Sequence, residues 1–136
     1  MEGAIRELTV VAAVIHDAEG RVLLTQRPAD THMGGLWEFP GGKIDGDEAY
    51  SDALARELEE ELGIEVEVKK PLTFAVHEEF GLRILLLFFE ARIVSGEPRG
   101  HEGQAVRWVP ASELPSYPTP PADAELVRLL ADGSIP

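Results

Sequence analysis

The sequence predicts a single layered α/β domain, because one strongly amphipathic helix is surrounded by apolar, β-branched segments. In the helix, Leu54, Leu58 and Leu62 recur every four residues, which places them on one face. Residues 8–15 and 84–93 have the apolar, β-branched composition of buried strands. The chain has 136 residues, 44% of them hydrophobic, so residues 1–136 are enough for one domain with its own core. Such a mixture of elements is expected to pack helices against a sheet.

The segments before the helix predict a β-hairpin followed by a functional loop. Leu8 to Ile15 is the first expected strand, Asp17 to Gly20 supplies a turn, and Val22 to Gln26 is the second strand. Asp30 to Asp47 is rich in glycine and is expected to be an ordered loop that carries function. The helix is then expected to begin near Asp47 or Glu48 and to end at Gly63, a natural C-terminal cap.

After the helix, the sequence alternates further strands with turns and closes on a second helix. No internal repeat or linker interrupts this order. The expected elements are strands at Thr73–Glu79 and Ile84–Ile93 joined through Phe80-Gly81, a short strand at Val106–Val109, an extended segment at Pro115–Pro121 and a helix at Ala122–Ala131.

Composition and charge exclude several classes of partner. The formal net charge of −13 argues against a nucleic acid polymer, which requires a basic surface. The longest apolar run, Ile84 to Phe89, is too short to span a membrane. Cysteine is absent, which removes disulfides and thiolate metal sites, and no signal peptide is visible at the N-terminus. We expect a cytoplasmic protein, monomeric or homodimeric, that acts on a small molecule.

Three carboxylates on the predicted helix indicate a metal site. Glu57, Glu60 and Glu61 stand at i, i+3 and i+4, so they share an arc of about 100° and repel one another. A cation between them would reverse that repulsion, and hard oxygen ligands suit Mg²⁺ or Mn²⁺. The alternative is a solvated acidic helix face, the usual meaning of a run of charge.

The sequence around these carboxylates resembles the Nudix box, the motif of a family that hydrolyses nucleoside diphosphates linked to another group. The matching pattern is Gly42, five residues, Glu48, seven residues and then Arg56-Glu57-Leu58-x-Glu60-Glu61-x-Gly63-Ile64. Other segments resemble the MutT-type branch, which hydrolyses nucleoside triphosphates: residues 24–30, 37–44, 101–104 and 120–123. The resemblance implies a mixed β-sheet sandwiched between α-helices (α/β/α), with the box as a loop–helix–loop, and Mg²⁺ as cofactor, for which Mn²⁺ can substitute.

Roles around the metal follow from the same resemblance. The implied metal ligands are the carbonyl of Gly41 and the carboxylates of Glu57, Glu60, Glu61 and Glu102. Arg56 is implied to orient a carboxylate, and the general base is either Glu57 or Glu102. Glu48 lies about 180° from Glu57 around the helix, so we expect it to cap or hold the box loop instead.

Nucleotide binding is implied for six residues: Arg27, His32, Glu38, Phe39, Pro40 and Asp123. Asp123 is the departure, since the MutT enzymes selective for oxidised guanine have asparagine there. An amide both donates and accepts a hydrogen bond, whereas an ionised carboxylate only accepts and favours an amino group such as that of cytosine or adenine. A protonated Asp123 would imitate the amide, which requires burial to raise its pKa.

Three functions are consistent with these residues. The first is Mg²⁺-dependent hydrolysis of nucleoside triphosphates to a monophosphate and pyrophosphate, which removes oxidised or modified nucleotides such as 8-oxo-dGTP. The second keeps this chemistry with CTP, modified cytosine or adenine nucleotides, or a nucleotide sugar. The third is a silent module that binds a nucleotide or damaged base, and the complete set of carboxylates argues against it.

Overall fold

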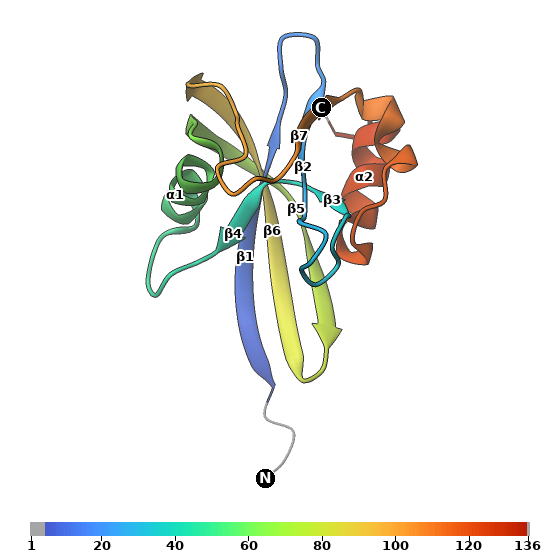
Figure 1. Ribbon diagram of the computed structural model, residues 1–136. Helices are drawn as coiled ribbons and strands as arrows, with labels where there is room; N and C mark the ends of the chain where they lie inside the picture. Colours follow the sequence, from blue (N-terminus) through green and yellow to red (C-terminus); the bar gives the residue numbers. More distant parts are fainter. Residues whose placement is uncertain (1–4, 136) are drawn as a thin grey trace.

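The computed structural model describes residues 5–135, which form two β-sheets between helical layers (Figure 1). The large sheet has the strand order β4-β1-β6-β5, and the small sheet has the order β3-β2-β7. The elements are β1 (Arg6–Ile15), β2 (Val22–Gln26), β3 (Trp37–Glu38), β4 (Gly41–Lys43), α1 (Tyr50–Leu62), β5 (Glu65–Glu79), β6 (Leu82–Ser95), β7 (Val106–Val109) and α2 (Ala124–Ala131), with 3₁₀ turns at Ala111–Ser116 and Pro121–Asp123.

The centre of the large sheet is a parallel pair, β1 and β6, in register from Arg6 opposite Leu82 to Ile15 opposite Ala91. The other pairings in this sheet are antiparallel, with β4 beside β1 and β5 beside β6. The sheet is therefore mixed, as the family resemblance implied. Among the described residues, no helix has the length and apolar character needed to cross a membrane.

Alternate residues of β1 face the two helical layers. Val11, Ala13 and Ile15 join one buried cluster, whose other members include the leucine stripe of α1. Ala12 and Val14 join a second cluster, to which α2 contributes Leu126, Val127 and Leu130. Figure 1 shows α1 and α2 on opposite sides of the sheets, so the predicted α/β/α layering is confirmed.

The predicted hairpin between the first two strands is wrong. β1 belongs to the large sheet and β2 to the small one, and only the bridge between His16 and Val22 joins them. Their short connection suggested direct pairing, but β1 is paired on both sides, with β4 and β6. The expected loop at residues 30–47 also contains β3 and β4, which are too short to produce a period-two pattern.

Several element ends differ from the prediction because local hydrogen bonds compete with the regular pattern. The box helix begins at Tyr50 rather than Asp47 or Glu48, since the Glu48 side chain accepts a hydrogen bond from the Asp45 amide in a turn. The helix does end before Gly63, whose φ of 68° forms the expected left-handed cap.

The later elements are shifted in the same way. β5 begins at Glu65, eight residues before the predicted strand, because its β-bulges interrupt the alternation. β6 is longer than predicted by two residues at each end. Part of Pro115–Pro121 is 3₁₀ rather than extended, and the last helix begins at Ala124, after a 3₁₀ turn.

Candidate active site

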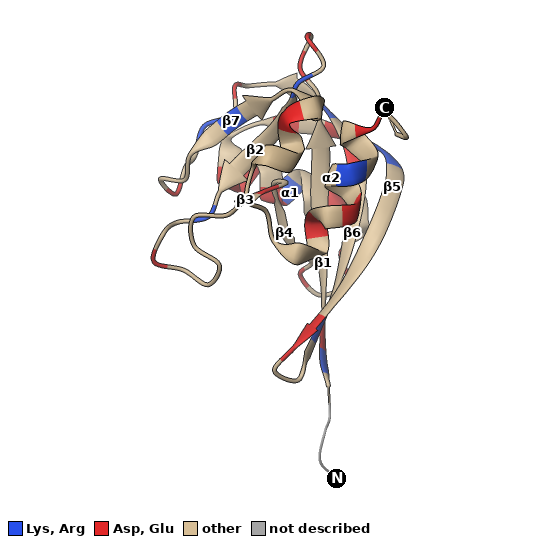
Figure 2. Cartoon of the chain, turned by 90° about the vertical axis from the view of Figure 1, so that its right-hand side faces the viewer, with Lys and Arg blue, Asp and Glu red and all other residues tan. Residues whose placement is uncertain are grey.

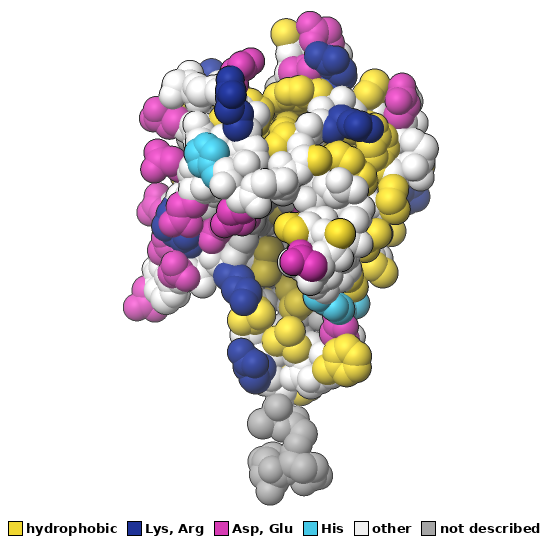
Figure 3. Space-filling view, in the orientation of Figure 1, with side chains coloured by type: hydrophobic (Ala, Val, Ile, Leu, Met, Phe, Trp, Pro, Cys, Tyr) yellow, Lys and Arg dark blue, Asp and Glu magenta, His cyan; other side chains and the backbone are white. Residues whose placement is uncertain are grey.

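A cleft crosses the α2-facing side of the large sheet and consists of two hollows that share residues. The first, here called the acidic hollow, has a volume of about 270 Å³ and reaches Gly41, Gly42 and Glu61. The second, the apolar hollow, has a volume of about 340 Å³. Both are lined by Val10, Arg27, Glu38, Lys43, Leu86 and Asp123, which makes the cleft continuous. Figure 3 shows acidic side chains gathered to one side of a hollowed, largely hydrophobic face.

Arg56 organises the acidic end of α1. Its Nη1 atom lies 3.1 Å from both Glu57 Oε1 and Glu60 Oε2. On the other side, Nε and Nη2 bind the two oxygens of Glu48 at 2.8 and 2.9 Å. Glu48 is thus not in the carboxylate cluster but is linked to it through one guanidinium, and these bonds lower the pKa of Glu48 to about 2. The expected box-loop contact is present, while the helix N-cap, Ala49, has no side-chain cap.

The paired glycines allow backbone and side chains to approach closely. At Gly42, a Cβ atom would collide with the Glu57 carboxylate, and at Gly41 it would collide with the carbonyl of Val11 on β1. Neither residue is among the glycines with positive φ, so an unusual backbone angle is not the reason for glycine at these positions. The requirement is space: Glu57 lies directly against β4, beside the backbone of Gly41-Gly42.

Glu61 is the carboxylate of the helix that lines the acidic hollow. Burial, followed by the charges of Glu57, Glu38, Glu102 and Glu60, raises the pKa of Glu61 to about 8. Burial also raises the pKa of Glu57, against the opposing effect of Arg56. The loop of Glu102 is attached to the helix end, because the amide of His101 donates to the Glu61 carbonyl at 3.0 Å. The fold therefore brings Glu102 towards the box.

These donors fit a hard divalent cation. Burial, and then the charge of neighbouring carboxylates, raises the pKa of Glu57 and Glu61; a cation would stabilise their ionised forms, and their oxygens suit Mg²⁺ or Mn²⁺. Within residues 5–135, no three acidic, histidine or cysteine side chains are already gathered tightly enough to form a metal centre. Arg56 holds Glu57 and Glu60, whereas Glu61 lies among other carboxylates. Coordination requires side-chain rearrangement around the same backbone.

The cleft also carries two neighbouring carboxyl groups, the buried Asp123 and the half-buried Glu38. Asp123 is only 3% exposed, and burial, followed by the charge of Glu38, raises its pKa to about 7. Burial also raises the pKa of Glu38, although Arg27 Nη1 lies 3.2 Å from its Oε1. Arg27 additionally donates to the carbonyl of His32 at 2.8 Å. The predicted residues Arg27, Glu38 and Asp123 therefore meet in one place.

The other predicted binding residues divide between the cleft and the core. Phe39 is 4% exposed, packs edge-on against Phe88 and lines the acidic hollow. Pro40 is buried and lines neither hollow; its carbonyl accepts a hydrogen bond from Ala13 on β1. Trp37 and Phe39, which are two residues apart, join the same core cluster. Pro40 thus anchors the turn between β3 and β4.

The apolar hollow contains residues that the sequence did not single out. Its floor is formed by alternate residues of β1 and β6, namely Leu8, Val10, Leu82, Ile84 and Leu86. His32 lines it as predicted, and His77 and Glu79 of β5 lie beside it, at the end opposite the carboxylates of α1. The period-two alternation of β6 could have indicated the floor, but only the pairing of β1 with β6 makes these residues neighbours.

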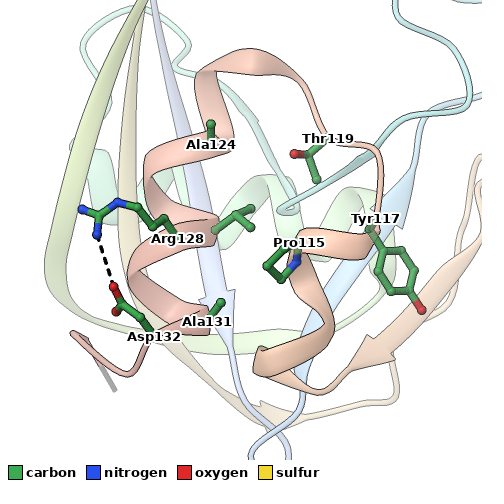
Figure 4. Close-up of a pocket in the computed structure, with 8 residues that line it drawn as sticks. Pro115, Tyr117, Thr119, Ala124, Arg128, Ala131 and Asp132 are labelled. Carbon is green, nitrogen blue, oxygen red and sulfur yellow. Dashed lines mark hydrogen bonds and ion pairs between the residues drawn. The ribbon is translucent and has the colours of Figure 1, made fainter.

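Another hollow lies away from this cleft, between α2 and the 3₁₀ turn at Ala111–Ser116 (Figure 4). Its lining includes Pro115, Tyr117, Ala124 and Ala131. Arg128 at its edge is bound to Glu125 and Asp132, at 2.6 and 3.2 Å. Its one cation is therefore already paired, and the acidic and apolar hollows remain the better candidate site.

Comparison with known proteins agrees with this geometry. The model of the NUDIX domain matches residues 6–130. A CTP pyrophosphohydrolase of Escherichia coli (strain K12) is 42% identical over 121 residues, covering 89% of each chain. An 8-oxo-dGTP diphosphatase of Haemophilus influenzae is 39% identical over 126 residues, covering 90% of each.

Solved structures lead to the same family. The solution structure of the E. coli ORF135 protein superimposes with a TM-score of 0.79 at 40% identity, covering 94% of this chain and 91% of that one. The domain match includes all of the box and most of the cleft. The chain is therefore a member of the Nudix hydrolase family.

Proposed function

We propose that this protein is a Mg²⁺-dependent nucleoside triphosphate pyrophosphohydrolase that releases a nucleoside monophosphate and pyrophosphate. The observation that carries the proposal is the continuous cleft with a carboxylate cluster at one end and, beside an apolar floor, the buried Asp123 with the half-buried Glu38. The carboxylate cluster can bind a polyphosphate through a metal ion, and Asp123 with Glu38 can bind a base. As a single domain acting on a free nucleotide, it needs no basic surface, in agreement with its net charge of −13 and with the acidic residues marked along the chain in Figure 2.

The acidic end would supply the metal ligands and the base. The carbonyl of Gly41 and the carboxylates of Glu57, Glu60, Glu61 and Glu102 would hold the cation. When bound, the cation neutralises phosphate charge and acidifies the attacking water. Glu57 and Glu102 are the candidates for accepting the proton of that water.

Arg56 would position the carboxylates rather than touch the substrate, since its donors are directed at Glu48, Glu57 and Glu60. Arg27 lies at the junction of the two hollows and would contact the nucleotide there.

The base end supports two substrate classes, which differ in the protonation of Asp123. A protonated Asp123 donates and accepts like an amide, which suits 8-oxo-guanine in the role of removing oxidised nucleotides. An ionised Asp123 only accepts and suits the amino group of cytosine. A pKa near 7 places both forms within reach at neutral pH and favours the first below it. The similarity to a CTP pyrophosphohydrolase keeps the second class as an alternative.

The test is a pyrophosphate-release assay with Mg²⁺ on 8-oxo-dGTP, dGTP, CTP, dCTP, 5-methyl-dCTP and ADP-ribose between pH 6 and 8.5. We expect the ratio of kcat/KM for 8-oxo-dGTP to that for dCTP to fall as pH rises through about 7. Asp123→Asn should remove this dependence on pH and fix the preference for 8-oxo-dGTP. A ratio that is independent of pH in the native protein would refute the role of Asp123, and absence of turnover would favour the binding module.

A further inference from the structure

The loop that connects β2 to β3 covers the apolar hollow. Its internal hydrogen bonds make it a compact unit. Residues 28–36 contain successive turns, in which the amides of Thr31, Gly34 and Leu36 donate to carbonyls three residues earlier. Arg27 donates to the His32 carbonyl, and Gln26 to the Gly35 carbonyl. Gly34 is packed so closely against the Ala29 carbonyl that a Cβ atom would collide with it. Hydrogen bonds and close packing within the loop therefore give it a compact shape.

The side of the loop facing the cleft carries Met33 and His32, both of which line the apolar hollow. Met33 has a φ of 57°, a left-handed conformation that is rare for a residue with a side chain. That conformation is maintained by the surrounding turns and keeps Met33 at the hollow. Met33 thus forms part of the hollow's cover, opposite the apolar floor from β1 and β6.

Across the hollow, Glu79 on β5 binds two histidines through one oxygen. Its Oε1 atom lies 3.0 Å from His77 Nε2 and 3.4 Å from His32 Nε2. The hydrogen bond from His77, together with that from His32, holds the pKa of Glu79 below its ordinary value. Among the described residues, the other hydrogen bonds of the loop end within it or on Gln26 and Arg27. The His32–Glu79 contact is therefore the polar link from this loop to the large sheet.

We propose that Glu79 is a positioning residue that, supported by His77, fastens the 28–36 loop through His32 and so holds the cover over the bound nucleoside. The inference rests on the proposed function in one respect, namely that the ligand of the apolar hollow is a nucleoside. Glu79 does not contact the reacting phosphates, since it lies at the end of the apolar hollow and lines no part of the acidic one. Its effect should fall on nucleotide binding and on loop mobility, and not on the chemical step.

The experiment compares Glu79→Gln with Glu78→Gln, the same change one residue earlier on the opposite face of β5. Glu78 binds Arg83 at 2.8 Å and does not line the apolar hollow, which makes it a matched control. For Glu79→Gln we expect a two- to fivefold higher KM for the best nucleotide, with kcat unchanged. Glu78→Gln should keep the native KM.

Hydrogen exchange measures the link without any substrate, so its result is independent of the proposed function. Protection of the amides of residues 28–36 should fall in Glu79→Gln and in His32→Gln at pH 6, and should remain native in Glu78→Gln. Native protection in Glu79→Gln would overturn the proposal whichever nucleotide is hydrolysed. A loss of kcat at native KM would also overturn it, because Glu79 would then act on the reaction itself.

Discussion

At the scale of single residues, the site depends on carboxyl groups that are costly to bury. Asp123 and Glu61 both have pKa values raised mainly by burial, to about 7 and about 8. Such groups reduce stability when they ionise and are retained where a ligand requires them. Both line the acidic hollow, so in the proposed function a nucleotide bound there would meet one group suited to its base and another suited to the metal on its phosphates.

Asp123→Asn should stabilise the protein increasingly with pH. A carboxyl whose pKa is raised from 3.8 to about 7 on folding favours the folded state at low pH, and this contribution is lost as pH rises between those values. The advantage of the asparagine variant in free energy of unfolding should therefore grow from pH 4 to 7 and then level off, reaching up to about 4 kcal/mol. Urea unfolding at several pH values measures it.

Asp132→Asn is the matched control for this experiment. Hydrogen bonds from Ser134 and the charge of Arg128 hold the pKa of exposed Asp132 below its ordinary value. Its ionised form contributes stability above the unfolded pKa, so the control should show no gain as pH rises. Equal pH dependence in both variants would mean that the burial of Asp123 does not raise its pKa.

At the scale of elements, the junction between β4 and α1 decides the geometry of the acidic end. β4 pairs with β1, and Val11 of β1 lies opposite Gly42 of β4. The leucine stripe of α1 belongs to the same buried cluster as Val11. Glu57 occupies the space that a side chain at Gly42 would take. The strand and the helix therefore fix this carboxylate from two sides, with Arg56 as the third restraint.

Alanine at each of the two glycines should separate catalysis from stability. Gly42→Ala meets only the end of the Glu57 side chain, so it should displace the carboxylate and lower kcat on the order of 10–100-fold with little change in Tm. Gly41→Ala meets the backbone of β1 and should cost about 1–3 kcal/mol of stability. Thermal unfolding and steady-state kinetics distinguish them, and a native kcat in Gly42→Ala would contradict the position of Glu57.

At the scale of the whole molecule, the excess of negative charge opposes compaction and disfavours an anionic substrate. The net charge is −13, and Figure 2 marks acidic residues in many parts of the chain. A bound divalent cation would offset both effects where they are strongest, at the carboxylates of α1. Metal binding should therefore be visible in the stability of the whole fold.

Millimolar Mg²⁺ should raise the Tm by several degrees, since a ligand of the folded state at 100 times its Kd adds about 2.7 kcal/mol. The gain should increase with pH through about 8, because protons compete with the metal for Glu61. NaCl at equal ionic strength controls for screening, and Glu61→Gln should reduce the gain. If NaCl raises Tm as much as Mg²⁺ does, the effect is screening and not a metal site.

The sequence by itself determined the α1 leucine stripe, the cap at Gly63, the layered α/β class and the family, because these follow from local periodicity and from a motif of fixed spacing. Helical spacing also placed Glu57, Glu60 and Glu61 on one arc. Only the tertiary structure decided which of them lines the cleft. Arg56 binds Glu57 and Glu60, whereas Glu61 is partly buried beside other carboxylates.

Local sequence patterns likewise did not determine which strands pair or which residues meet at the far end of the cleft. β1 and β2 are close in sequence but belong to different sheets, because β1 is paired on both sides by β4 and by the distant β6. His32 and Glu79 are separated by most of the box and the helix, and no local pattern relates them. Periodicity reports which face of an element is buried, whereas the partner on that face is chosen by long-range packing.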